Sequence, residues 1–301
     1  MTFALSIAGL VIRVTEPNQC PTVAWPLRPF ERFLTDAAAP PDMTAFVRVT
    51  ERLPELPRTE LRFDAEAGLW RLFSASEGFV LECQDPMTLV LRSVAAISPD
   101  FRTLRIWTIP SGLNGPSSWT PMQVFNPILE VACLTLLARR GGCVIHSSGV
   151  ILGDGGYLFC GPSGAGKSTI AAMFAGFGAL VLSDERLVLT RSASGFLMHG
   201  TPWVGSGQYA ANASGPLTAL YTIAHARDGH RLQQPSRGKL LSSLLQQTFL
   251  PQWDRDAMDR TLSFLESCLN DTFHGHLAFS KDPSVVNFVR SLRAASPLVA
   301  S

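Results

Sequence analysis

The chain has 301 residues, of which 46% are hydrophobic and 16% charged, a balance typical of compact rather than disordered proteins. Its net charge of +1 provides no general field that would attract nucleic acid or an acidic membrane surface. The six cysteines are scattered without a CxxC pair, which argues against a zinc site or a disulfide framework and predicts reduced thiols in a cytoplasmic protein.

Residues 1–122 predict a β-rich N-terminal domain. They hold 13 of the 21 prolines, and short apolar runs alternate with turn-forming clusters. The first apolar run, residues 3–12, lacks the basic flank of a signal peptide, and we interpret it as one strand. We expect Trp70, Trp107 and Trp119 to lie in a core or an interface. No catalytic pattern is present, so substrate docking, dimerisation and structural support all remain open for this domain.

Residues 123–301 predict a second domain of α/β class. Asn126-Pro127 is typical of a helix start, and Gly141-Gly142 of the end of that helix. Two short strands are expected next, at 143–146 and 149–152.

A phosphate-binding loop is predicted after the strand at 157–160 and before a helix at 170–175. The G-x-x-x-x-G-K-[ST] pattern matches at every fixed position, through residues Gly161, Pro162, Ser163, Gly164, Ala165, Gly166, Lys167, Ser168 and Thr169. Glycines let the backbone approach a phosphate, and amides at a helix start attract anions. We expect Lys167 to reach the β- and γ-phosphates of ATP and Ser168 to ligate Mg²⁺.

Asp184 and Glu185 follow the next predicted strand, residues 179–182, and Asp184 lies only 17 residues after Lys167. Carboxylates at a strand end beside a phosphate-binding loop hold Mg²⁺ or accept a proton. We assign Asp184 as general base and Glu185 as metal ligand, with both acids counted as candidate metal ligands. The reverse assignment stays open, as does a site in which one acid alone is catalytic.

The rest of the chain predicts a strand at 217–224, helices at 238–247 and 256–269, a strand at 273–279 and a final helix from 282. The loop 199–216 is the expected wall of a substrate path, with Trp203 as an apolar contact. We expect one arginine to stabilise the charge that develops during transfer. The sequence does not distinguish among the candidates Arg186, Arg191, Arg227 and Arg237. His274 and His276 share a strand face but lack a third metal ligand.

These motifs resemble the HPr kinase/phosphorylase family. The matching pieces are His146, Gly155-Gly156, the loop 161–169 and Asp184-Glu185. The resemblance is strongest to stand-alone HPr-kinase-like proteins of peptide natural-product clusters, including the lasso-peptide kinases. It implies a P-loop kinase core of the HPr-kinase/PEP-carboxykinase-like type, in which His146 contacts the γ-phosphate or steers the acids.

The family resemblance has three departures. Glu185 stands where the family usually has Asp, Thr169 stands where true HPr kinases carry Glu, and the glycine-rich C-terminal signature is missing. These differences argue against HPr as substrate and against the reverse phosphorylase reaction.

We therefore expect an ATP- and Mg²⁺-dependent serine kinase whose acceptor is a peptide or small protein, in particular a ribosomally made lasso-type precursor. Nucleic acid and membrane are not expected partners, and a homo-oligomer is possible. The alternatives are an HPr(Ser) kinase, a non-catalytic ATP-binding regulatory module, and a hydrolase that drives a partner. The order of motifs argues against a transport ATPase, and the absence of an Asn-Lys-x-Asp motif argues against a small GTPase.

Overall fold

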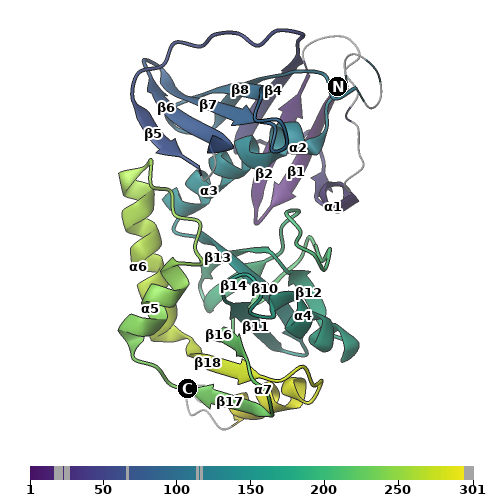
Figure 1. Ribbon diagram of the computed structural model, residues 1–301, viewed down its shortest axis with the longest axis vertical. Coiled ribbons are helices and arrows are strands. Elements are labelled where there is room, and N and C mark those ends of the chain that lie inside the picture. The colour runs from purple at the N-terminus through teal and green to yellow at the C-terminus, as the bar shows by residue number, and fades with distance from the viewer. Residues whose placement is uncertain (17–22, 24–27, 66–67, 113–114, 116–117, 295–301) are drawn as a thin grey trace. The chain divides into compact units, whose positions relative to one another are not determined.

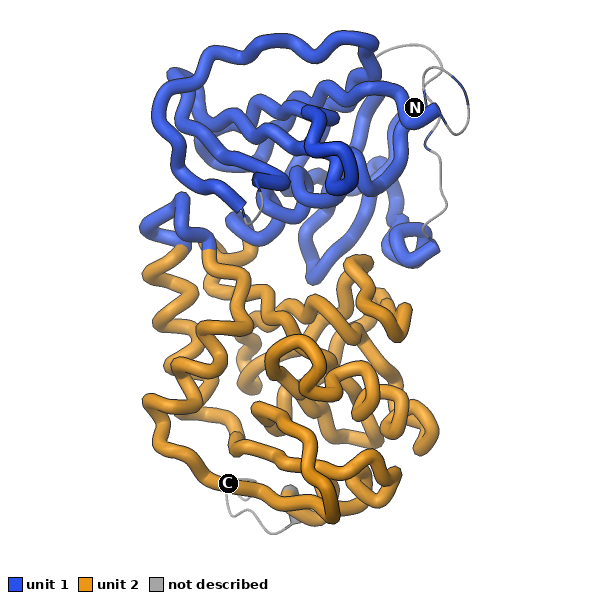
Figure 2. Tube along the Cα trace, viewed as in Figure 1, with its two compact units in different colours: residues 1–136, 251–257 blue, residues 137–250, 258–301 orange. Residues whose placement is uncertain are grey.

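The computed structural model describes residues 1–16, 23, 28–65, 68–112, 115 and 118–294. It has mixed α/β content, with two large mixed sheets and few helices (Figure 1). The chain divides into two compact units (Figure 2). Unit 1 comprises residues 1–136 and 251–257, and unit 2 comprises residues 137–250 and 258–301.

Unit 1 is built on a nine-stranded sheet in the order β3-β1-β2-β4-β9-β8-β7-β6-β5, as its β-rich sequence predicts. The β2–β4 and β4–β9 pairs are parallel, and the other neighbours are antiparallel. Its elements are β1 (Thr2–Ile7), β2 (Leu10–Thr15), α1 (Arg28–Glu31), β3 (Leu34–Thr35), β4 (Met43–Val49), β5 (Leu61–Asp64), β6 (Trp70–Ala75), β7 (Gly78–Gln84), β8 (Leu91–Ile97) and β9 (Thr103–Thr108).

The first apolar run forms a hairpin, so the prediction of one strand over residues 3–12 is wrong. β1 and β2 pair in register from Thr2↔Thr15 to Ile7↔Leu10. Ala8 and Gly9 form the turn with φ values of 51° and 79°. A two-residue turn of this kind needs positive φ at both central positions, and a glycine supplies one of them without strain.

The helical segment consists of α2 (Pro121–Val124), η2 (Phe125–Leu129) and α3 (Glu130–Arg139). It is kinked at Asn126, whose φ of −122° and ψ of 117° are not helical, so the helix predicted from Asn126-Pro127 begins at this kink and the short helix α2 precedes it. The side chain of Gln123 accepts a hydrogen bond of 2.7 Å from the backbone N–H of Thr120, which satisfies a donor at the helix start. The Thr-x-x-Gln spacing was the signal for this cap.

This helical segment also explains why unit 1 continues to residue 136 rather than ending at 122. The ring of Phe125 lies 4.7 Å from Phe30, 5.8 Å from Trp119 and 6.3 Å from Phe3. All four rings are buried, and Trp119 has no exposed surface, as expected for a core residue. Burying these aromatic groups ties the first helical turns to unit 1.

Pro121–Arg139 is the one described helical segment long and apolar enough to span a membrane. However, 78% of its most apolar window is buried inside the protein, as in the core helix of a soluble protein.

Unit 2 has a second nine-stranded sheet, in the order β15-β14-β13-β10-β11-β16-β18-β17, with β12 also paired to β10. Its elements are β10 (Cys143–Leu152), β11 (Gly155–Cys160), α4 (Lys167–Gly176), β12 (Leu180–Ser183), β13 (Arg186–Ser192), β14 (Gly195–His199), β15 (Ser214–Pro216), β16 (Ala219–His225), β17 (His230–Gln233), α5 (Arg237–Leu245), α6 (Arg255–Asp271), β18 (Phe273–Phe279) and α7 (Val285–Ala294). The two strands predicted at 143–146 and 149–152 form the single strand β10.

The centre of this sheet is parallel. β11 pairs with β16, and β16 pairs with β18, in parallel, so their carboxyl ends meet at one edge. Alternate β11 side chains enter two cores: Leu158 packs in the cluster that includes α5 and α6, and Phe159 in the cluster that includes α4 and α7. Ligands of open α/β sheets bind outside the carboxyl ends of such strands, so this edge is the natural place to look for a site.

Candidate functional site

A glycine loop, residues 161–166, connects β11 to α4 at this edge. Gly164 and Gly166 have φ values of +80° and +100°, a region that disfavours other residues. A Cβ on Gly166 would lie 2.8 Å from Cζ of Phe279 and 2.9 Å from Cε1 of His225. The loop therefore passes close to the ends of β16 and β18, and glycine at 166 is required by both conformation and space.

Lys167 is the first residue of α4 and is 7% exposed. Its Nζ donates hydrogen bonds to the carbonyl oxygens of Gly161 at 2.8 Å and Pro162 at 3.2 Å. Burial lowers the pKa of this ammonium group, and the nearby Glu185 carboxylate opposes that shift. The loop thus holds a cation against its own backbone.

Asp184 follows β12 and is 1% exposed. Its Oδ1 accepts the backbone N–H of Gly205 at 3.1 Å, and its Oδ2 accepts that of Gly207 at 2.7 Å. The Ser168 hydroxyl donates to Oδ2 at 3.2 Å. A Cβ on Gly207 would lie 2.6 Å from Oδ2, so glycine is needed for this approach. These donors fix the carboxylate beside the Ser168 hydroxyl, and such oxygen ligands suit Mg²⁺.

Glu185 makes a different set of contacts from its neighbour. Nδ1 of His146, on β10, lies 3.2 Å from Oε1 of Glu185 and 3.1 Å from its carbonyl oxygen. The hydrogen bond from His146 is the largest cause of a lowered Glu185 pKa, and burial acts in the opposite direction. The Glu185 side chain is 29% exposed, so its carboxylate is both ionised and accessible.

These groups line one cavity of about 530 Å³ in unit 2. That volume lies within the usual ~300–1,000 Å³ of ligand sites. The predicted residues that line it are His146, Ser163, Gly164, Gly166, Lys167, Ser168, Thr169, Asp184 and Glu185. The other predicted loop residues, Gly161, Pro162 and Ala165, complete the turn without lining the cavity. Ser206 lines it too and comes from the loop predicted as a wall.

Two lining residues were missed by the sequence interpretation, His225 and Lys281. His225 is the last residue of β16, and Lys281 lies just after β18. Once the two strands are known to run parallel to β11, their carboxyl ends identify both residues. Lys281 is also one of only three lysines in the chain.

Other predicted residues lie elsewhere. None of the four candidate arginines lines this cavity: Arg191 pairs with Asp271 at 3.1 Å, and the Arg186 guanidinium lies 5.1 Å from the centre of the Phe249 ring. Trp203 is only 3% exposed, so it packs inside the protein and offers little surface to a substrate.

Within the described part of the chain, no group of three or more His, Cys, Asp and Glu residues is arranged to hold a metal ion. His276 instead lies 3.0 Å from the Thr222 hydroxyl. This leaves the Ser168–Asp184 pair as the candidate metal contact, with the remaining ligands to come from outside the protein. No model of a known protein family matches the chain, and no curated protein matches it either.

Proposed function

We propose that this chain is an ATP-dependent kinase that transfers the γ-phosphate to a serine or threonine hydroxyl of a peptide or small protein. In this proposal unit 2 is a P-loop kinase core of the HPr-kinase-like type. One observation carries the proposal: a single cavity combines the glycine loop and Lys167 with a Ser168–Asp184 pair and a separate Glu185–His146 pair. Phosphoryl transfer needs these elements, namely phosphate positioning, charge neutralisation and a group that orients the hydroxyl.

The residues present fit a nucleoside triphosphate and Mg²⁺. The positive-φ glycines bring backbone close to the cavity, and the N-terminus of α4 opens beside it. Mg²⁺ is usually held by one or two carboxylates together with substrate phosphates and water, so the Asp184 carboxylate and Ser168 hydroxyl are a sufficient protein contribution. Bound Mg²⁺ would supply charge neutralisation at the β- and γ-phosphates.

The contacts favour the reverse of the acid roles that the sequence first indicated. Both oxygens of Asp184 already accept hydrogen bonds, and the residue is almost fully buried beside Ser168. Asp184 therefore suits the metal, as a fixed ligand. Glu185 is partly exposed and is oriented by His146, so it suits the role of general base. His146 is a positioning residue in this assignment.

The transfer step then balances simply. The acceptor hydroxyl oxygen forms a bond to the γ-phosphorus, and the bond from that phosphorus to the β–γ bridging oxygen breaks, releasing ADP. The hydroxyl proton passes to the Glu185 carboxylate. Lys167 and Lys281 neutralise charge on the transferring group, and Lys281 takes the place that no candidate arginine occupies in this cavity.

The acceptor class rests on the family resemblance and on charge. A net charge of +1 disfavours a nucleic-acid acceptor. The polar lining suits a small hydroxyl-bearing side chain, and the Ser206 loop forms part of its wall.

Mass spectrometry tests the proposal directly. The protein is incubated with ATP, Mg²⁺ and serine-containing precursor-type peptides, and the same reaction with Lys167→Ala serves as control. A peptide mass gain of ~80 Da, one phosphate on a hydroxyl, is expected only with the wild-type protein. Labelling of HPr alone would identify an HPr kinase, and phosphate release without a labelled acceptor would identify a hydrolase. ATP binding without turnover would identify a regulatory module.

A further inference from the structure

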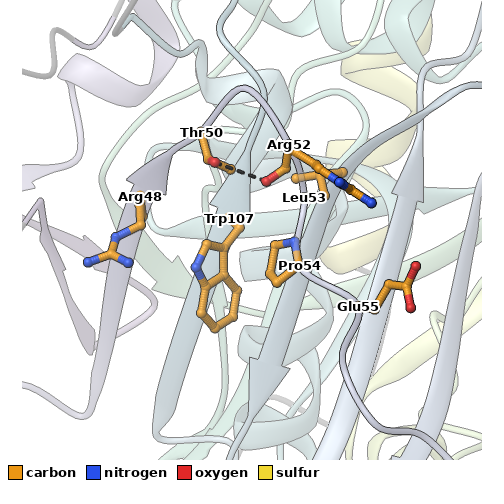
Figure 3. Close-up of a pocket in the computed structure, with 7 residues that line it drawn as sticks. All are labelled: Arg48, Thr50, Arg52, Leu53, Pro54, Glu55 and Trp107. Carbon is orange, nitrogen blue, oxygen red and sulfur yellow. Dashed lines mark hydrogen bonds between the residues drawn. The ribbon is translucent and has the colours of Figure 1, made fainter.

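Unit 1 contains its own cavity, of about 430 Å³, near the carboxyl ends of the parallel neighbours β4 and β9 (Figure 3). Side chains from both strands and from the segment that follows β4 line it. They are Arg48, Thr50, Arg52, Leu53, Pro54, Glu55 and Trp107. The sequence interpretation assigned no chemistry to any of them.

The cavity is basic and aromatic. Arg48 and Trp107 are directly paired across the two strands, and the preceding pair on the same face is Phe46↔Arg105. Aromatic and guanidinium groups thus alternate on this face, and Phe46 is 38% exposed. In the described part of the chain neither Arg48 nor Arg52 has an ion-pair partner, and Glu55 is the single acid that lines the cavity.

One wall of the cavity is an extended segment with a free backbone. The segment is anchored where it starts, because the backbone N–H of Thr50 donates to Thr108 at 2.9 Å and the Thr50 hydroxyl donates to the Arg52 carbonyl at 2.9 Å. It is anchored again where it ends, since Arg58 pairs with Glu82 and stacks 4.8 Å above the Phe73 ring.

Between these anchors, residues 53–57 make no hydrogen bond between backbone groups within the described structure. Pro54 and Pro57 carry no backbone N–H, so the unused groups are the N–H groups of residues 53, 55 and 56 and the carbonyl oxygens of the segment. Main-chain hydrogen bonds to groups of this kind are one way in which proteins bind extended peptides.

We propose that this cavity binds an acidic segment of a peptide or protein. The two guanidinium groups would receive its carboxylates in charge-assisted hydrogen bonds, and Trp107 would cover an adjacent apolar group. A peptide is favoured over nucleic acid because a peptide backbone uses the free groups of residues 53–57. Glu55, which also lines the cavity, can accept a hydrogen bond from a peptide N–H, a donor that a phosphodiester backbone does not have.

Fluorescence anisotropy tests the proposal without nucleotide, so its outcome is independent of any transferase activity. The probe is a fluorescein-labelled hexapeptide of alternating Glu and Phe, compared with the same peptide carrying Gln for Glu. The wild-type protein should bind the Glu peptide at least tenfold more tightly, because hydrogen bonds to charged groups contribute more than neutral ones. Arg48→Glu and Trp107→Ala should each weaken binding about tenfold or more.

Arg28→Glu is the matched control, since it makes the same charge change on α1 of the same unit, outside the cavity. Circular dichroism of each variant establishes that unit 1 is folded. No measurable binding of the Glu peptide would overturn the proposal, as would equal binding of the Gln peptide. An Arg28→Glu effect as large as that of Arg48→Glu would indicate unspecific attraction instead. Tighter binding of a labelled oligothymidylate, lost in Arg48→Glu, would identify a nucleic-acid site.

Discussion

The hydroxyl of Ser168 lies 3.2 Å from Oδ2 of Asp184, on the first turn of α4 and at the end of β12 respectively. The neighbouring acid, Glu185, turns instead to His146. Consecutive residues at a strand end point to different sides, so two adjacent carboxylates serve two separate partners. Removing the charge of each acid should therefore have a different effect on the reaction.

Glu185→Gln keeps the size of the side chain and removes its proton-accepting charge. Under the proposed function, turnover at saturating Mg²⁺ should fall about 10²-fold or more, while the Mg²⁺ concentration for half-maximal rate stays the same. Steady-state kinetics over a Mg²⁺ series measures both quantities. Full turnover in this variant would refute the assignment of Glu185 as base.

Asp184→Asn should act on the metal instead. We expect the Mg²⁺ concentration for half-maximal rate to rise at least about tenfold, because one charged oxygen ligand is lost. Ser168→Ala should shift it in the same direction. Ser194→Ala, in the turn after β13, is the matched control and should leave the curve unchanged. If the Mg²⁺ concentration for half-maximal rate is unchanged in Asp184→Asn, Glu185 rather than Asp184 is the metal ligand.

Lys281 should matter to transfer although no motif contains it. Lys281→Ala should lower turnover by about 10-fold to 10²-fold, since a cation near the transferring group is removed, and Lys281→Arg should restore most of it. Lys239→Ala, on α5 and outside the cavity, is the control among the three lysines. Equal rates for the Lys281→Ala and Lys239→Ala variants would show that Lys281 takes no part.

Trp253 should be a stability determinant of unit 1. Its ring lies 5.3 Å from Phe63 and 5.7 Å from Trp70, and its Nε1 donates to the Thr135 hydroxyl at 2.9 Å. Trp253→Ala should lower the free energy of unfolding by about 3–5 kcal/mol, the usual cost of removing a large buried ring. Hydrogen exchange should localise the loss to unit 1. Trp107→Ala, which removes a partly exposed ring, should cost much less.

Glu16 should impose a pH dependence on stability. It is 4% exposed, and burial raises its pKa above the usual 4.5, while a hydrogen bond from Trp119 opposes the shift. The Glu16 carboxyl therefore holds its proton more tightly in the folded state than in the unfolded state. As a result, the free energy of unfolding decreases as the pH rises from about 4.5 past the raised pKa of Glu16.

Glu16→Gln should remove the decrease in stability with rising pH that ionisation of Glu16 causes. Urea unfolding of both proteins from pH 4.5 to pH 7.5 measures the difference in the free energy of unfolding. Glu31→Gln, on α1, is the control. Parallel curves for wild type and Glu16→Gln would contradict the prediction.

Much of the candidate site could be predicted because its signals are local. The glycine loop, Lys167 and Ser168 are contiguous, and the strand–loop–helix order of β11 and α4 matches their pattern. The strand at 273–279 forms with the predicted bounds, because its flanks are polar and its alternation is clear. Asp184 follows an apolar run, which identified its strand as well.

The rest depends on contacts between residues distant in sequence. His225 and Lys281 reach the cavity only because β16 and β18 join β11 in parallel, an order that no local pattern contains. Assignment of the two acids likewise required their partners, and Gly207 lies 23 residues from Asp184. The boundary between units was missed because a helix that looked like the start of unit 2 packs its first turns into unit 1.

The return of residues 251–257 to unit 1 has a consequence for synthesis. As the polypeptide leaves the ribosome from its N-terminus, unit 1 lacks Trp253 until more than four fifths of the chain has been made. Unit 2 lacks β18 and α7 until later still. A chain that stalls before residue 251 would therefore leave both units incomplete at once, whereas one that stalls between residues 257 and 273 would leave only unit 2 incomplete. Unit 1 thus receives its last segment first, and unit 2 receives its last strand and helix only after that.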